Sequence, residues 1–112
     1  MTSLADRKCA PGGQATALDA TDIAKHLAAL ADWTVVNNSQ GNALQKTFPF
    51  KNYYETLAFV NASAWVSHRE DHHPDMGVHY NRCVVSYSTH DAGGITLNDF
   101  ICAAKLDRLF AL

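Results

Sequence analysis

The sequence predicts an α+β fold, in which a four-stranded antiparallel sheet has three helices packed on one face. Three observations predict it. The apolar pattern changes between helical and extended periods in the order helix, two strands, helix, two strands, helix. No strand–helix–strand repetition of the kind that builds a parallel sheet is present. The length of 112 residues and the apolar content of 47% suit one compact domain.

The N-terminal region differs in composition from the remainder of the chain. Residues 1–17 mix charged residues with Pro11, Gly12 and Gly13 and contain no apolar run. We therefore expect a flexible tail that is neither a signal peptide nor a membrane anchor, followed by one folded domain over residues 18–112.

A helix and a hairpin are predicted to open the folded domain. Asp19 is a good cap for the helix, which should end near Ala31. Residues 33–36 and 43–48 each have the pattern of a strand. The turn-rich residues 37–42 between them predict a hairpin.

A long second helix is predicted from Asn52, a good cap with Glu55 at the third helical position. Pro74 disfavours helical backbone at His73, so the helix should end there and leave His72 and His73 at its terminus. Spacings of three and four place one stripe of side chains on a single face. This stripe consists of Tyr54, Leu57, Asn61, Trp65, His68 and His72.

Two further strands are predicted over residues 76–80 and 83–90, and the second alternates between a core face and an open face. Thr96 and Asp99 then have the spacing of a capping box for a final helix that continues to Phe110. The core face of the strand should carry Cys83, Val85, Tyr87 and Thr89, and the open face Val84, Ser86, Ser88 and His90.

Charge and cysteine spacing argue against several classes of protein. The net charge of −2, without a stripe of Lys and Arg, gives no electrostatic footprint for nucleic acid, so no direct nucleic-acid partner is expected. No membrane partner is expected either. Cys9, Cys83 and Cys102 are odd in number and widely spaced, which indicates neither a disulfide framework nor a zinc ribbon. Reduced thiols and a cytoplasmic location are the expectation.

The histidines point to proton-transfer chemistry. Four of the six histidines lie between His68 and His79. Imidazole gives or takes a proton near neutral pH, so a histidine cluster suits a reaction that needs both an acid and a base. The informative strings are His72-His73-Pro74, Ser88-Thr89-His90 and the later Asp99, and no metal, nucleotide or nucleophile motif accompanies them.

These strings, together with Tyr80-Asn81, resemble the pterin-4a-carbinolamine dehydratases, also called 4a-hydroxytetrahydrobiopterin dehydratases. The similarity extends from the first helix through Trp33 and Phe48-Pro49-Phe50-Lys51 to the final helix. It implies a four-stranded antiparallel sheet with helices on one face. It also implies homodimers or homotetramers, built by joining sheets edge to edge and by packing helices.

The resemblance implies a reaction, the removal of water from the 4a-carbinolamine of a tetrahydropterin to give the quinonoid dihydropterin. This step recycles the pterin cofactor of aromatic amino acid hydroxylases. The expected partner is a small-molecule pterin, and the enzyme is expected to use no cofactor and no metal of its own. The catalytic residues implied are His72, His73 and His90, and the substrate-binding residues are Ser88, Thr89, Asp99 and His68.

The dehydration requires one acid and one base. The hydroxyl on C4a must be protonated to leave, while N5 must lose a proton so that its lone pair can form the new double bond. We predict that His72 or His73 protonates the hydroxyl and that His90 binds the pterin or accepts the N5 proton. Asp99 can be a helix cap, a pterin ligand or both. His68 departs from the many relatives that have an acidic residue there.

Two alternatives stay open. His68 and His72 are four residues apart, and with His73, Asp75 or His79 they could form a zinc or nickel site, although the zincin glutamate after the first histidine is missing. The second alternative is a dimerisation or binding module for a protein partner, because vertebrate members of the family stabilise dimers of a homeodomain transcription factor.

Two structural expectations follow from this interpretation. His72, His73 and His90 should converge in one small cleft, because the predicted helix and strand can meet at their ends. The sheet should also have an exposed edge, which favours pairing with a second copy of the chain in a homo-oligomer with twofold symmetry.

Overall fold

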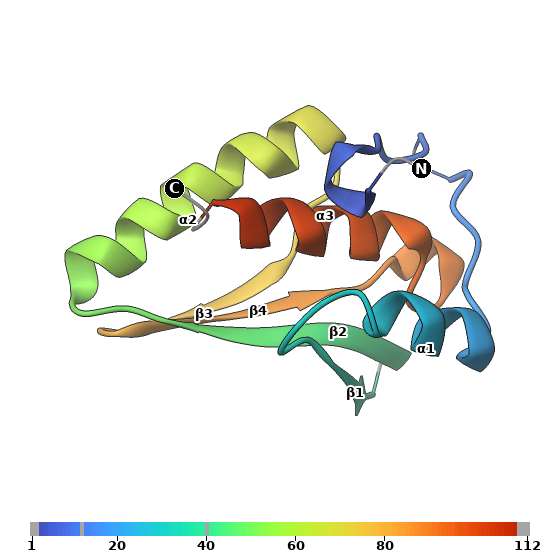
Figure 1. Ribbon diagram of the computed structural model, residues 1–112, viewed down its shortest axis with the longest axis horizontal. Helices are drawn as coiled ribbons and strands as arrows, with labels where there is room; N and C mark the ends of the chain where they lie inside the picture. Colours follow the sequence, from blue (N-terminus) through green and yellow to red (C-terminus); the bar gives the residue numbers. More distant parts are fainter. Residues whose placement is uncertain (1–2, 12, 40, 110–112) are drawn as a thin grey trace.

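The computed structural model describes residues 3–11, 13–39 and 41–109. Four strands form one sheet, and they span Thr34–Asn38 (β1), Gly41–Pro49 (β2), Asp75–Val78 (β3) and Arg82–Tyr87 (β4). The sheet is antiparallel throughout, with the strand order β1-β2-β4-β3 (Figure 1). The strands β1 and β3 therefore form its two edges.

Two helices, α2 (Tyr53–Glu70) and α3 (Leu97–Arg108), cover one face of the sheet (Figure 1). A shorter helix, α1 (Ala20–Leu27), lies against α3, where the His26 ring is 5.3 Å from the Phe100 ring. Two short 3-10 helices, η1 and η2, span Leu4–Asp6 and His90–Ala92. The predicted α+β class and its four-stranded antiparallel sheet are confirmed. In the described ranges, no helix is both long and apolar enough to cross a membrane.

The core lies between the sheet and α3. Cys83, Val85 and Tyr87 on β4 are fully buried, as the predicted alternation requires, and they join Phe100 and Leu106 of α3 in one apolar cluster. Burial of apolar side chains is the largest favourable contribution to folding, so this cluster fixes α3 on the sheet. The end of β4 and the start of α3 are thereby held at one side of the molecule.

The predicted helix starts are confirmed by their caps. The Asn52 side-chain oxygen accepts a hydrogen bond from the backbone N–H of Glu55 at 2.9 Å. The Asp19 carboxylate accepts one from the N–H of Asp22 at 2.8 Å. Both bonds satisfy backbone donors that have no partner within the first helical turn.

Several element ends differ from the predicted ones. α1 ends at Leu27 rather than near Ala31. The pairing of β1 with β2 continues through Asn37 and Asn42, which we predicted to lie in the turn. Hydrogen bonds of the ladder outweigh the weak turn preference of asparagine at these positions. Phe110, which we predicted to lie in the final helix, falls outside the described residues.

The predicted stripe on α2 faces outward. Tyr54 and Trp65 are 80% and 69% exposed, whereas Thr56, Phe59 and Ser63 form the buried face of the helix. Helical spacing identifies residues that share a face, but the position of the sheet decides which face is covered. The aromatic stripe is therefore a surface feature.

Residues 3–10, which belong to the predicted flexible tail, are docked on α2 and α3 in this structure. We call these residues the N-terminal segment. The N–H of Cys9 donates to the Glu70 carboxylate at 2.8 Å, and the N–H of Ala10 donates to the Asn98 side chain at 2.8 Å. These partners lie 61 and 88 residues along the chain, so local composition could not reveal them.

Candidate active site

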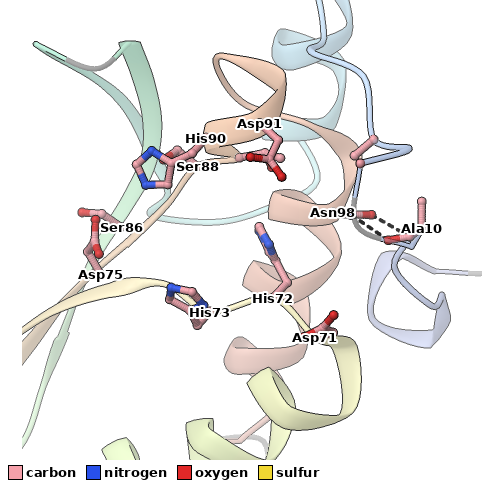
Figure 2. A pocket seen from close by; sticks show the side chains of 13 residues that line it. Ala10, Asp71, His72, His73, Asp75, Ser86, Ser88, His90, Asp91 and Asn98 are labelled. Carbon is pink, nitrogen blue, oxygen red and sulfur yellow. Dashed lines mark hydrogen bonds between the residues drawn. The ribbon is translucent and has the colours of Figure 1, made fainter.

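A cavity of about 270 Å³ opens where the end of α2, the end of β4 and the N-terminal segment meet (Figure 2). His72, His73 and His90 all line it. The predicted convergence of these three imidazoles is therefore confirmed. Its further polar lining includes Asp75, Ser86, Ser88, Thr89, Asp91 and Asn98.

The two adjacent histidines both lie beyond the end of α2. The helix ends at Glu70, three residues before the position that Pro74 led us to expect, because Asp71 adopts a left-handed conformation with φ 50° and ψ 44°. This conformation is a common way for a helix to stop. It places His72 and His73 beyond the helix, in the connection to β3. There the two side chains point in different directions (Figure 2).

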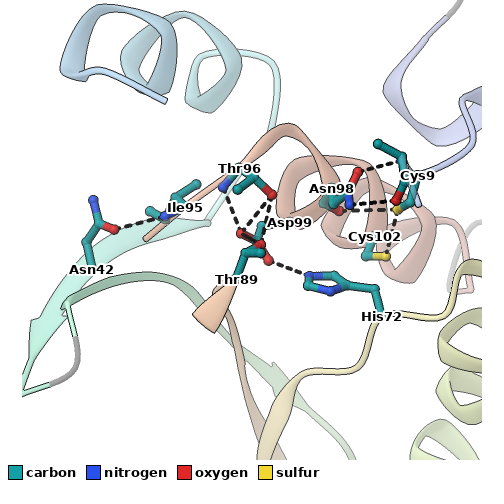
Figure 3. Close-up of polar contacts among 10 residues, drawn as sticks. Cys9, Asn42, His72, Thr89, Ile95, Thr96, Asn98, Asp99 and Cys102 are labelled. Carbon is teal, nitrogen blue, oxygen red and sulfur yellow. Dashed lines mark hydrogen bonds and ion pairs between the residues drawn. The ribbon is translucent and has the colours of Figure 1, made fainter. Parts of the chain in front are cut away.

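His72 is held on two sides. Its Nε2 atom lies 2.6 Å from Oδ1 of Asp99 (Figure 3). Its ring also stacks on that of Tyr87, with centroids 5.7 Å apart and planes at 19°. Because an ionised carboxylate only accepts hydrogen bonds, the Nε2 atom carries the proton of this bond. The Nδ1 atom is then the ring nitrogen that a substrate can use.

Asp99 is fully buried and serves two structural purposes. Its Oδ2 atom accepts hydrogen bonds from the N–H of Thr96 at 2.8 Å and from the hydroxyl of Thr89 at 2.9 Å. The first bond belongs to the predicted capping box, which is confirmed. Asp99 does not line the cavity, so its predicted direct contact with substrate is not what the structure shows. It reaches the cavity through His72 and Thr89, both of which line it.

A closed turn presents His90. The backbone groups of Thr89 and Gly94 are hydrogen-bonded in both directions, at 3.1 and 3.3 Å, so the four residues between Thr89 and Gly94 form a small loop. Gly93 has a positive φ of 78°, which glycine adopts without strain. β4 therefore ends before His90, contrary to our expectation of a strand to residue 90. The loop leaves His90 and Asp91 exposed at the cavity.

The side chains of His73 and His90 are exposed and make no hydrogen bond to other residues in the described part of the chain. Asp75 and Asp91, each one or two positions after a motif residue, bring two carboxylates to the same cavity. We had considered Asp75 only as a possible metal ligand, and we had not assigned Asp91 to any site. Their proximity to His73 and His90 in the sequence was the signal that could have identified them.

His68 does not reach the cavity. It lies on the outer face of α2, with its ring 6.0 Å from that of Trp65. The alternative metal site requires His68 and His72 on the same face of one helix. The two residues do not share a helical face, because α2 ends at Glu70, before His72. Among the residues that the structure describes, no group of three or more His, Cys, Asp or Glu side chains is placed to hold a metal ion.

Comparisons with known proteins point to one family. A family model described as pterin 4 alpha carbinolamine dehydratase matches residues 16–109. A protein of Chromobacterium violaceum, provisionally named pterin-4-alpha-carbinolamine dehydratase, is 56% identical over 109 residues, which is 96% of both chains. A protein of Nitrosospira multiformis with the same provisional name is 51% identical over 110 residues, covering 97% of this chain and 94% of the relative.

A solved structure is also similar. The crystal structure of a protein from Brucella melitensis, described as a transcriptional coactivator/pterin dehydratase, superimposes with a TM-score of 0.78. The sequence identity is 29%, and the match covers 84% of this chain and 98% of the other. The likeness therefore extends to the overall fold.

Proposed function

Because this chain belongs to the pterin-4-alpha-carbinolamine dehydratase family, we propose that it removes water from a pterin 4a-carbinolamine in the cavity that His72, His73 and His90 line. The product is the quinonoid dihydropterin, and the enzyme is a hydro-lyase that acts on a carbon–oxygen bond. The observation that carries the proposal is the meeting of three imidazoles on one small cavity, although 17 positions of sequence separate His73 from His90.

The reaction needs two proton transfers. A protonated side chain donates to the hydroxyl on C4a, and the C4a–oxygen bond breaks to release water. A neutral side chain accepts the proton of N5, whose electron pair forms the C4a–N5 double bond. Each positioned proton transfer accelerates a reaction by about 10²–10⁴-fold, which is adequate for a dehydration that proceeds slowly without a catalyst.

Each of the three histidines has a proposed role. His72 or His73 supplies the proton to the leaving hydroxyl, and His90 binds the pterin or accepts the N5 proton. The bond of His72 to Asp99 sets its ring orientation and tautomer. Proton transfer of this kind needs no metal ion.

Two residues that follow the last strand complete the proposed site. Ser88 lines the cavity, and its hydroxyl is available to hydrogen-bond the polar edge of the pterin. The Thr89 hydroxyl already bonds Asp99 and Thr96, at 2.9 and 2.8 Å, so Thr89 acts as a positioning residue. Asp99 acts in the same way, through His72.

Stopped-flow loss of a synthetic 4a-carbinolamine tests the proposal directly. The wild-type protein should accelerate the loss with and without a metal chelator, and replacement of both His72 and His73 by alanine should abolish the acceleration. His79→Ala, a histidine that does not line the cavity, is the matched control and should retain the wild-type rate. Activity that disappears with chelator and returns with zinc would contradict the metal-free mechanism. Full activity of the double variant would contradict the site.

We propose that the protein is a cytoplasmic homodimer or homotetramer. Tyr54 and Trp65 leave an aromatic surface on α2, and β1 and β3 leave two sheet edges, both of which favour association with a second copy. The three cysteines are free thiols, as is usual in a reducing compartment. Sedimentation of only a 12.3 kDa species at micromolar concentration would contradict the assembly.

A binding module for a protein partner is the second candidate function. The same aromatic surface on α2 supports it, and the structurally similar Brucella protein is described as a transcriptional coactivator. The double His72 and His73 variant separates the two functions. An enzyme loses dehydration while it keeps its association, whereas a pure binding module shows no dehydration in the wild-type protein either.

A further inference from the structure

Two cysteine thiols lie side by side beneath one wall of the cavity. The Sγ atoms of Cys9, in the N-terminal segment, and Cys102, on α3, are 3.6 Å apart although the residues are separated by 93 positions (Figure 3). Cys102 is fully buried, whereas Cys9 is partly exposed. One member of the pair is therefore accessible to a reagent in solution, and the other is accessible only to its neighbour.

The pair is connected to the cavity through the residues next to it. Cys9 is followed by Ala10, whose N–H and C=O bond the Asn98 side chain at 2.8 and 3.1 Å. Ala10 and Asn98 both line the cavity. Asn98 also lies one turn before Cys102 on α3, and its backbone C=O is 3.7 Å from the Cys9 sulfur. A covalent link between the two sulfurs would therefore fasten this wall.

We propose that Cys9 and Cys102 are a redox-active thiol pair, closed to a disulfide by exchange with a low-molecular-weight disulfide, which fastens the N-terminal segment to α3. A disulfide has an S–S length of roughly 2.05 Å, so the two sulfurs must approach by only about 1.5 Å from their present separation. Side-chain rotation and a small movement of the segment, which lies on the surface, supply that approach.

The exchange proceeds in two balanced steps. The Cys9 thiolate attacks one sulfur of oxidised glutathione, forms a mixed disulfide and releases one glutathione thiolate. Cys102 then loses its proton and attacks the Cys9 sulfur, which forms the protein disulfide and releases the second glutathione. Two protein thiols are oxidised, one glutathione disulfide is reduced, and the two protons end on the two glutathione thiols.

The environment of the pair sets this order. The hydrogen bond to Cys9 and burial both raise the pKa of the Cys102 thiol, which keeps it protonated and unreactive toward solution reagents. Exchange must therefore begin at Cys9, which is partly exposed. Cys83 is buried in β4, and burial raises the pKa of its thiol as well. It serves as the internal control for a thiol without a neighbouring sulfur partner.

The test is oxidation of the reduced full-length protein with oxidised glutathione, followed by alkylation in denaturant and mass spectrometry. We expect one alkylated cysteine, Cys83, and a peptide linked through Cys9 and Cys102. The disulfide closes a long loop and should raise Tm by roughly 5 to 15 °C, because it restricts the unfolded chain. Neither measurement depends on dehydratase activity, so the result is independent of the proposed function.

Cys9→Ser is the matched control, since this partly exposed position tolerates a hydroxyl, and it should show neither the link nor the Tm shift. Cys102→Ala removes the second step and should stop at glutathione attached to Cys9. Three results would each overturn the proposal: a stable glutathione adduct on wild-type Cys9, a disulfide between two chains, or a linked protein whose Tm equals that of the reduced form.

Discussion

The two sides of the cavity differ in how firmly they hold their histidines. On one side, His72 is bonded to the buried Asp99 and stacked on Tyr87, and its side chain is only 14% exposed. On the other side, His73 and His90 are exposed and make no side-chain hydrogen bond within the described residues. The site therefore combines one imidazole of fixed orientation with two that can adjust to the substrate.

This difference shows how one cavity can serve both binding and chemistry. A fixed imidazole is preorganised for proton transfer, and the residues that fix it belong to the folded core. An exposed imidazole contributes nothing to the fold and takes up its geometry only when substrate arrives. Substitutions on the two sides should consequently separate stability from activity.

The largest effect is expected for Asp99. Asp99→Asn presents an amide N–H₂ or a reoriented oxygen to His72 and disturbs its tautomer, so kcat should fall by about 10²–10³-fold. Asp99→Ala also leaves the Thr96 N–H and the Thr89 hydroxyl without their acceptor and should cost about 2–4 kcal/mol of unfolding free energy. Stopped-flow rates and urea unfolding measure the two effects.

Asp107→Asn, on the same helix but bonded to Lys46 and Trp33, is the control for Asp99. Its rate should stay within about twofold of wild type, because it does not touch the cavity. If the Asp99→Asn protein kept the wild-type rate, the fixed orientation of His72 would not matter for the reaction.

The histidines themselves sharpen the comparison. Alanine at His72, His73 or His90 should lower kcat by about 10-fold to 10³-fold in each case. His72→Ala should also lower Tm by roughly 5 to 10 °C, because it removes the partner of the buried Asp99. The His73 and His90 variants should melt within about 2 °C of wild type. An equal loss of Tm in all three variants would mean that His73 and His90 also stabilise the fold.

The anchor of the N-terminal segment should make stability depend on pH. Burial opposes ionisation of Glu70, but the Cys9 N–H and the charges of Lys105 and Lys8 together hold the pKa of this carboxyl below its ordinary value of 4.5. A lowered pKa stabilises the folded state above the ordinary value, and this stabilisation disappears as the pH falls through the folded pKa.

Glu70→Gln is the corresponding test. The variant should be less stable than wild type at pH 7, and the difference should shrink as the pH is lowered below 4.5. Urea unfolding at several pH values measures it, with Glu55→Gln at the start of α2 as a control. A difference that does not vary with pH would mean that the Glu70 charge does not hold the segment.

The smallest effect is expected at the ring beneath His72. The Tyr87 hydroxyl is fully buried, and it is a side-chain polar atom for which the described residues supply no hydrogen-bond partner. Tyr87→Phe keeps the stacked ring and should change unfolding free energy by less than about 1 kcal/mol and kcat by less than about twofold. Tyr87→Leu, which removes the ring, should lower kcat more. A large loss in Tyr87→Phe would assign the hydroxyl a role in the reaction.

Local chemistry by itself determined the type and order of the elements and which residues share a face. The Asn52 and Thr96 caps, the alternation along β4 and the bias of Pro74 against helix act within a few residues, so spacing predicts them. The motif strings and the family resemblance likewise identified His72, His73 and His90. These properties depend on residues that are neighbours in the sequence.

Only the tertiary structure decided which of these side chains meet. The bond of His72 to Asp99 joins residues 27 positions apart, and the docking of Cys9 on Cys102 joins residues 93 positions apart. His68 was placed outside the site because α2 ended at Glu70 and turned its outer face to solvent. Contacts between distant segments result from packing helices on the sheet, and no local pattern encodes that packing.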